Sequence, residues 1–129
     1  MPVLAVYKGV RISPRKVNVV AALVRGRTVA DAVTILEHTP RRSALAVKKA
    51  VVSAGANAEH NHNYKPDTLF ISEISVTPGI RYRRYRAAAR GRALRFARST
   101  SQIRVLVDGQ KRENKKVVAK SADQEKADE

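Results

Sequence analysis

The sequence predicts an α+β domain with three helices and about three strands, the strands being antiparallel. Three stretches repeat apolar residues at helical spacing, between residues that commonly start and stop helices. Three other stretches are rich in β-formers, and two of them alternate apolar and polar residues. With 129 residues, of which 43% are hydrophobic, the chain is long enough for one domain with a packed core.

The first strand is predicted over Val3 to Val10, and the first helix follows it. Ser13 is a good N-cap, Pro14 suits the first helical position, and Gly26 can adopt the left-handed conformation after the last turn. The buried face of this helix is predicted to consist of Val17, Val20, Ala21 and Val24.

The second helix is predicted to start at a Thr28 cap, with Asp31 in its first turn and a buried face of Val29, Ala32, Val33 and Leu36. Thr39 and Pro40 are expected to end it and to begin a third helix, as the cap and the first residue. The third helix is predicted to continue through residues 41–60, with a stripe of small residues: Ala44, Val47, Val51, Ala54 and Ala58. Residues 60–67 are predicted to form a loop.

Two further strands are predicted over residues 69–76 and 101–107. Their alternation points one set of side chains inward: Phe70, Ile74 and Val76 in one strand, and Ile103, Val105 and Val107 in the other. Thr77–Gly79 and Asp108–Gly109 mark the ends of these strands.

Residues 81–98, between these two strands, contain eight arginines, no lysine and no acidic residue. Ala, Leu and Arg favour a basic helix here, but its apolar face would be thin and Gly91 would interrupt it. The alternative is a long β-hairpin whose arms continue the two flanking strands. Local patterns leave both conformations open, and neither is stable alone in water because the arginines repel one another.

The formal net charge of +15 lies almost entirely in residues 1–110, which hold 20 basic and 6 acidic residues. Such a field in a folded domain favours a polyanionic partner, and nucleic acid is the usual one. Arginine bonds phosphate oxygens in pairs and stacks on bases, as Tyr82, Tyr85 and Phe96 can also do. Residues 111–129 have mixed charge and few apolar residues, so they are predicted to be a disordered tail.

Several function classes lack support in the sequence. The chain has no cysteine, which excludes disulfides and thiolate metal sites. The N-terminus does not resemble a signal peptide and no stretch approaches a membrane span, so we expect a soluble intracellular protein. His60 and His62, with Glu59, form a weak metal-site candidate, and an exposed loop is the favoured interpretation. No nucleophile motif or phosphate-binding glycine loop is present, so we expect no catalysis, no cofactor and no metal.

Two other binding classes have less support in the sequence than RNA binding. A helix-turn-helix DNA-binding protein would use the second helix as its reader, but Asp31 and Glu37 make that helix unsuited to base edges. A basic membrane-surface or calmodulin-binding segment would need a large apolar face, which residues 81–98 lack.

Three blocks of sequence resemble the bacterial-type large-subunit ribosomal protein family called L-twenty-two: "SPRKVNVVAALVRG", "ALAVKKAVVSAGANAEHN" and "RGRALRFARSTSQIRVLV". Their order and spacing match from the first strand to Val107. The resemblance implies three helices packed on a small antiparallel three-stranded sheet with a long protruding hairpin, about residues 77–102, in a single domain over residues 1–110. It favours the hairpin over the local helix for the arginine segment.

The resemblance also implies a function in the cytoplasmic ribosome. The protein is expected to be a structural constituent of the large subunit that binds its ribosomal RNA, assists assembly and lines the peptide exit tunnel with the hairpin. Expected partners are large-subunit ribosomal RNA, neighbouring ribosomal proteins and the nascent peptide, with no membrane and no homo-oligomer.

Site residues carry over by position from the family. Ser13, Pro14, Arg15 and Lys16 match the start of its first helix, and Asn57 and Glu59 match its "ANAE" stretch. The expected RNA-binding residues are Arg11, Ser13, Arg15, Lys16, Arg25, Lys48, Lys49, Arg81, Arg83, Arg84, Arg86, Arg90, Arg92, Arg95, Arg98 and Thr100. The expected tunnel-lining residues are Tyr82, Arg83, Arg84, Ala88, Arg90, Gly91 and Arg92, and family variants in the arm at residues 82–84 affect macrolide susceptibility.

Overall fold

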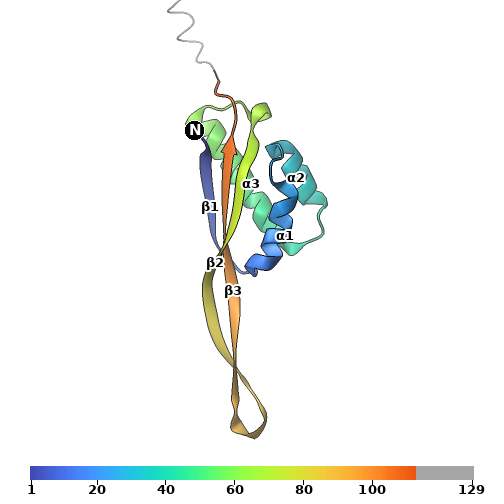
Figure 1. The fold of residues 1–129 in the computed structure, drawn as a ribbon, viewed down its shortest axis with the longest axis vertical. Coiled ribbons are helices and arrows are strands. Elements are labelled where there is room, and N and C mark those ends of the chain that lie inside the picture. Colours follow the sequence, from blue (N-terminus) through green and yellow to red (C-terminus); the bar gives the residue numbers. More distant parts are fainter. Residues whose placement is uncertain (113–129) are drawn as a thin grey trace, which may run out of the picture.

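The computed structural model describes residues 1–112 and has the predicted α+β architecture (Figure 1). In chain order the elements are β1 (Val3–Val10), α1 (Pro14–Val24), α2 (Val29–His38), α3 (Arg42–His62), a short 3-10 turn (Pro66–Thr68), β2 (Phe70–Ala87), a second 3-10 turn (Ala89–Gly91) and β3 (Ala93–Asp108). The three strands form one antiparallel sheet in the order β1-β3-β2. The helices lie on one side of this sheet, and β2 and β3 extend far beyond them as a hairpin.

The first two helices follow their sequence signals. In α1, Pro14 takes the first helical position and the four predicted residues Val17, Val20, Ala21 and Val24 are buried. In α2, the Thr28 hydroxyl accepts a hydrogen bond from the Asp31 backbone N–H at 3.2 Å. This is the N-cap that the sequence predicted, and it satisfies a donor that a helix start leaves free.

The third helix differs from its prediction at both ends. It begins at Arg42, with Arg41 as N-cap, because the Thr39 hydroxyl instead donates to the Ile35 carbonyl at 2.7 Å and closes the last turn of α2. It also continues through His60 to His62, which had been predicted as loop. Asn63 ends the helix in the left-handed conformation (φ 55°), and the Tyr64 N–H bonds back to the Ala58 carbonyl at 3.0 Å.

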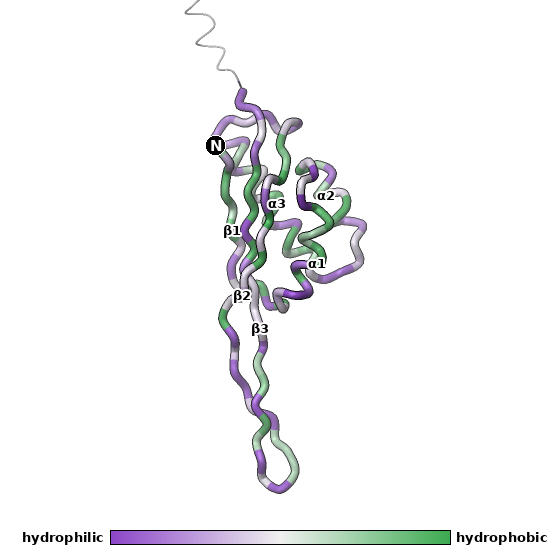
Figure 2. Tube along the Cα trace, in the orientation of Figure 1, coloured by the Kyte–Doolittle hydropathy of each residue, from purple (hydrophilic) through white to green (hydrophobic). Residues whose placement is uncertain are grey.

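The core lies between the sheet and the helices and consists almost entirely of Val, Ile, Leu and Ala side chains. Its fully buried members include Val17, Val20, Val24, Val47, Val51, Ile71, Ile74, Ile103, Val105 and Val107. No hydrophobic side chain in residues 75–102 is buried. Figure 2 shows the same division, with hydrophobic stretches running through the body and hydrophilic residues prominent in the protruding arms.

The inward face of β2 was predicted incorrectly at one position. Phe70 is 44% exposed, whereas its neighbour Ile71 is fully buried together with Ile74. The register between β2 and β3 shifts between Ile71 and Glu73, which is a β-bulge. An extra residue at a bulge reverses the alternation of side chains, so the residues before it face the opposite way from a regular strand.

The last described residues belong to the folded body. Lys111 pairs with Tyr64 in an isolated β-bridge, and the Arg112 guanidinium bonds Glu59 Oε1 at 3.0 Å. The rest of the predicted tail, residues 113–129, lies outside the described residues. Within the described part of the chain, no helix is long and apolar enough to cross a membrane.

The bulge predicts that alanine substitutions at two neighbouring positions have different effects on stability. Ile71→Ala should lower the free energy of unfolding by about 2–5 kcal/mol, because it leaves a cavity in the core. Phe70→Ala should cost about 1 kcal/mol or less, because that ring is half exposed. Urea unfolding of the full chain measures both values. A larger loss for Phe70→Ala than for Ile71→Ala would contradict the bulged register.

Candidate nucleic-acid interface

The arginine segment forms a two-stranded ribbon rather than a helix. Residues 81–87 of β2 pair with residues 93–99 of β3 in regular antiparallel register. Because side chains alternate between faces, one face combines three arginines with Tyr82 and Phe96, and the other combines three with Tyr85. The first set of arginines is Arg84, Arg86 and Arg98, and the second is Arg81, Arg83 and Arg95. Cross-strand pairs put cations opposite aromatic rings: Tyr82 faces Arg98, Arg84 faces Phe96 and Tyr85 faces Arg95.

Cation–π contacts support the ribbon in place of a hydrophobic core. The guanidinium carbons of Arg86 and Arg98 lie 5.7 and 5.8 Å from the centroid of the Phe96 ring. That of Arg95 lies 6.0 Å from the Tyr85 ring. Such contacts contribute about 0.5–1 kcal/mol each at exposed sites. They keep both the guanidinium planes and the rings at the surface, where bases could stack on them.

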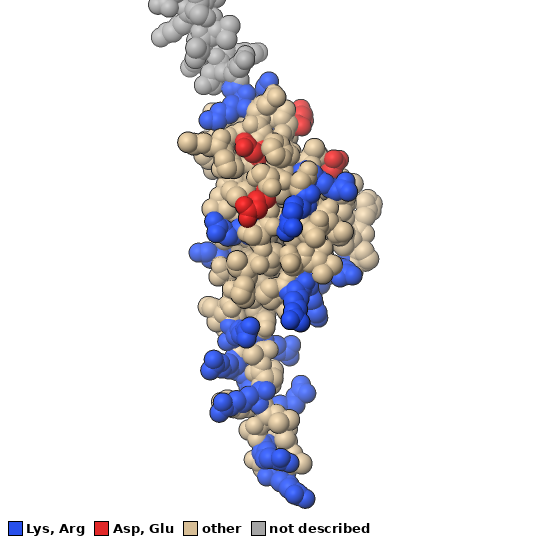
Figure 3. Space-filling view, in the orientation of Figure 1, with Lys and Arg blue, Asp and Glu red and all other residues tan. Residues whose placement is uncertain are grey.

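The eight hairpin arginines are exposed and have no acidic partner within residues 1–112. Both ion pairs in this part of the chain lie in the body, between Lys48 and Glu37 and between Arg112 and Glu59. Figure 3 shows basic side chains down the whole hairpin and acidic ones over the body. The hairpin therefore carries a dense positive charge that nothing in its described surroundings neutralises.

A tight turn closes the tip of the hairpin. Arg90 and Gly91 both have left-handed backbone conformations (φ 61° and 70°), the combination found in type I′ turns. The Ala88 N–H donates to the Arg92 carbonyl at 2.8 Å, and the Arg92 N–H donates to the Ala89 carbonyl at 3.5 Å. Arg90 and Gly91 are therefore the two central residues of the turn, and Arg92 follows them.

A second irregularity lies where the hairpin leaves the body. The register of β2 against β3 shifts between Pro78 and Arg81. The Thr100 hydroxyl donates to the Ile80 carbonyl at 2.6 Å, and a Cβ on Gly79 would lie only 2.6 Å from that same hydroxyl oxygen. Gly79 is therefore required for the close approach of the two strands, and the hydroxyl of Thr100, a predicted RNA-binding residue, is engaged in holding the strands together.

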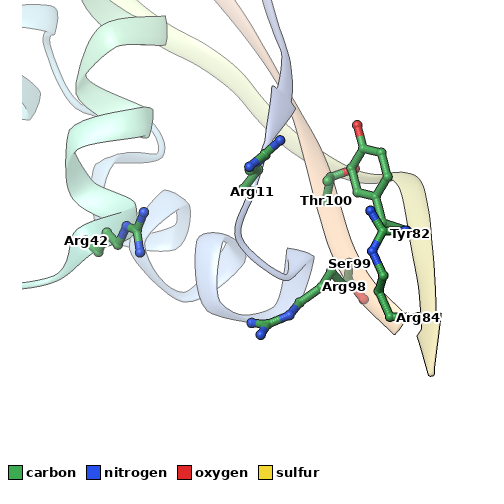
Figure 4. A pocket seen from close by; sticks show the side chains of 7 residues that line it. All are labelled: Arg11, Arg42, Tyr82, Arg84, Arg98, Ser99 and Thr100. Atoms are coloured by element: carbon green, nitrogen blue, oxygen red, sulfur yellow. The ribbon is translucent and has the colours of Figure 1, made fainter. Parts of the chain in front are cut away.

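Two adjoining hollows, of about 350 and 670 Å³, lie between this point and the body. We call them together the root cleft. Its body side is formed by Arg11, Ile12, Ser13, Lys16, Arg41, Arg42 and Ser43, and its hairpin side by Tyr82, Arg84, Ala97, Arg98, Ser99 and Thr100. In Figure 4 the Arg42 and Arg98 side chains extend toward one another across the space between α3 and the hairpin. The cleft has six basic lining residues and no acidic one.

The structure separates the predicted site residues into groups. Arg11, Ser13, Lys16, Arg84 and Arg98 converge on the root cleft. Arg81 and Arg83 lie on the opposite face of the ribbon, and the other hairpin arginines lie further along it. Arg25 donates to the Ile74 carbonyl at 3.2 Å and so joins the end of α1 to β2. Arg15 and Lys49 are exposed on the body.

Lys48, another predicted RNA-binding residue, is paired within the protein. Its ammonium group donates to Glu37 Oε1 at 2.7 Å, and this hydrogen bond holds the pKa of Glu37 below its ordinary value. Glu37 is therefore ionised at neutral pH. Lys48 is thus less available to an external anion than the hairpin arginines.

Arg41 and Arg42 were missed by the sequence prediction although both line the root cleft. The signal was present as two consecutive cations at a helix start, but only the tertiary structure brings this helix start to the hairpin root. His60 and His62, considered as metal ligands, lie in the last turn of α3. No group of three metal-binding side chains occurs in residues 1–112.

Comparisons with family models and with individual proteins all point to one family. Residues 5–108 match the family described as ribosomal protein L22p/L17e. The chain is 47% identical over 111 residues to the large ribosomal subunit protein uL22 of Oceanobacillus iheyensis, covering 86% of this chain and 98% of that protein. It is 43% identical to the uL22 protein of Desulforamulus reducens (86% and 98% covered) and 42% identical to that of Thermomicrobium roseum (84% and 92% covered).

The crowding at Gly79 predicts that a glycine-to-alanine substitution there lowers stability, whereas the same substitution at Gly55 raises it. Gly79→Ala should lower the free energy of unfolding by about 1–3 kcal/mol, because the new methyl group would overlap the Thr100 hydroxyl. Gly55→Ala in α3 should instead stabilise by up to about 1 kcal/mol, because its Cβ meets only Val29 Cγ1 at 3.4 Å and alanine favours helices. Urea unfolding measures both, and equal effects would contradict the packing at the hairpin root.

Proposed function

Because this chain belongs to the ribosomal protein L22p/L17e family, whose members are proteins of the large ribosomal subunit rather than enzymes, we propose a specific role for it there. Its body and hairpin bind large-subunit ribosomal RNA and assist the assembly of that RNA. The hairpin also lines the exit tunnel of the nascent peptide. The single observation that carries this proposal is the ribbon of eight exposed arginines, none of which has an acidic partner in residues 1–112.

The ribbon is electrostatically unfavourable in the protein alone. Like charges close together in a sheet are destabilising, and a two-stranded hairpin without a packed face is at best marginally stable in water. Phosphate groups supply the missing negative charge, and arginine forks bond their oxygens in pairs. An RNA that surrounds the ribbon would therefore turn the repulsion among its arginines into a binding energy.

The aromatic rings favour RNA that includes unpaired bases. Protein contacts to single-stranded RNA commonly stack bases on aromatic rings or on guanidinium planes. Tyr82 and Tyr85 are 41% and 66% exposed, and each is paired across the ribbon with an arginine. The two faces of the ribbon each carry arginines and at least one ring, so the hairpin is suited to contact RNA on both sides. Such contacts to separate RNA segments would help assembly.

The shape of the hairpin suits a tunnel wall. At about 3.3 Å per residue, the arms beyond Arg81 reach roughly 20 Å from the body. The tip consists mainly of small residues, with Ala87, Ala88, Ala89 and Ala93 beside the turn at Arg90 and Gly91. A slender tip can reach between RNA segments and still present Arg90 and Arg92 to a passing peptide.

The structure also bears on the alternative binding functions. In a helix-turn-helix protein α2 would read the DNA groove, yet Asp31 and Glu37 are both exposed on it. These two acidic side chains would bring negative charge toward the phosphates. The hairpin offers no apolar face for a membrane surface, because its exposed hydrophobic residues are interspersed with arginines on both faces.

Phosphate binding by the hairpin predicts a steep dependence on salt. Replacing Arg81, Arg83, Arg86 and Arg95 with glutamine should reduce the slope of log affinity against log salt by about 3–4, at roughly 0.7–0.9 per lost phosphate contact. Binding of the full chain to a large-subunit ribosomal RNA transcript measures this slope. The unfolding midpoint serves as control and should change little, because none of the four residues is buried and the relief of charge repulsion offsets the loss of the cation–π contacts of Arg86 and Arg95. An unchanged slope would show that these arginines do not contact phosphates.

The tunnel role predicts contact between the tip and a nascent peptide. The chain has no cysteine, so Arg92→Cys would provide a single attachment point at the tip for a thiol-reactive crosslinker. In ribosomes that contain this variant and hold a stalled peptide, we expect a crosslink to the peptide. Ser53→Cys, exposed on α3, is the matched control and should give none. Incorporation without a crosslink at position 92, or an equal crosslink at position 53, would contradict the tunnel role.

A further inference from the structure

Two of the three helices begin with charges of the wrong sign for a helix start. The N-terminus of a helix carries partial positive charge, so acidic residues and side-chain caps normally stabilise it. Helix α2 follows this rule, with the Thr28 cap and Asp31. Helices α1 and α3 have no acid in the first turn and no side-chain cap, and they begin instead with Arg15 and Lys16 and with Arg41 and Arg42.

Both of these exceptional helix starts open into the root cleft. Ser13 and Lys16 from α1, and Arg41, Arg42 and Ser43 from α3, line the same hollow, whereas no residue of α2 does. Ser43 is only 5% exposed, and its hydroxyl makes no side-chain hydrogen bond within residues 1–112. Two helix N-termini, several cations and the Ser43 hydroxyl at the wall of the cleft all offer positive potential or hydrogen bonds to the same space. An anion is the ligand that satisfies them together.

The cleft also joins the two parts of the molecule. Arg11 and Arg42 lie on its body side, and Arg84 and Arg98 belong to the two arms of the hairpin. In the protein alone these two sides repel each other. Between the body and the hairpin the strands pass through the register shift at Pro78–Arg81, where bulges bend a ribbon. A negative group in the cleft would attract both sides at once and hold the ribbon at one angle.

We propose that the root cleft binds a backbone phosphate of RNA and thereby acts as a clamp that fixes the direction of the hairpin relative to the body. This inference rests on the proposed RNA-binding function and adds a specific site to it. The arginines further along the ribbon bind RNA without setting its direction. The phosphate in the cleft is the contact that bridges body and hairpin.

The test compares two double variants of the full chain with equal loss of charge. Arg11→Gln with Arg42→Gln removes the body side of the clamp. Lys65→Gln with Arg104→Gln removes two exposed cations outside the cleft and is the control. The clamp variant should bind a large-subunit ribosomal RNA transcript at least about tenfold more weakly than the natural sequence, because charge-assisted bonds to phosphate are lost. The control should change by less than about fivefold.

The stability of the free protein shows whether Arg11 and Arg42 bind phosphate or stabilise the fold. Removing Arg42 from the first turn of α3 relieves an unfavourable interaction with the helix dipole. The clamp variant should therefore unfold at the same temperature as the natural sequence or at a higher one. A lower unfolding temperature, together with an RNA affinity equal to that of the control, would show that the two arginines serve the fold and would overturn the proposal.

Distance measurement tests the clamp itself. Spin labels on Ser53→Cys in α3 and Ala89→Cys at the tip report the angle between body and hairpin, since the chain has no other cysteine. Saturating RNA should narrow the distribution of distances between the two labels in the natural sequence and in the control variant. It should not narrow this distribution in the clamp variant. Equal narrowing in all three backgrounds, or narrowing by millimolar inorganic phosphate alone, would overturn the clamp while leaving RNA binding intact. Failure of the natural sequence to bind the transcript would overturn the proposed function as well.

Discussion

Repulsion among unpaired arginines is the constraint on which the rest of this structure depends. Eight guanidinium groups lie on a two-stranded ribbon that has no acidic side chain between Glu73 and Asp108, and none of them has an acidic partner within residues 1–112. Nor can the ribbon compensate by burying apolar surface, because the core ends at Ile74 on β2 and resumes at Ile103 on β3. The hairpin is therefore held by backbone pairing, by cation–π contacts and by its continuity with the sheet of the body.

The body anchors this ribbon. Its three helices cover one face of the sheet and supply the valine and alanine side chains of a core that includes no buried residue from positions 77–102. At the root, Gly79 and the bond from Thr100 to Ile80 let the strands approach closely where their register shifts. The cations at the starts of α1 and α3 oppose the local rule for helix stability. Such local conflicts are common at functional sites, where a ligand compensates for them.

The sequence by itself determined the body of this protein to a large extent. The valine and alanine stripes of α1, α2 and α3 follow the helical period, and the Thr28 cap with Asp31 is a local signal that the structure confirms. The inward faces of β3 follow from alternation alone, since Ile103, Val105 and Val107 are all buried. These features depend on residues three or four apart along a helix or two apart along a strand, so they can be read without knowing what packs against them.

Only the tertiary structure decided the features that depend on a distant partner. The segment at residues 81–98 has the local composition of a helix, and it is a ribbon because β2 and β3 pair along their full length from the body outward. Phe70 and Ile71 exchange faces because of a bulge that exists only in the pairing with β3. Arg11, Arg42 and Arg98 are far apart in the sequence and meet only where α3 and the hairpin root face each other. Local periodicity specifies which face a residue takes, but the register between strands and the convergence of like charges are set by contacts that a single segment does not contain.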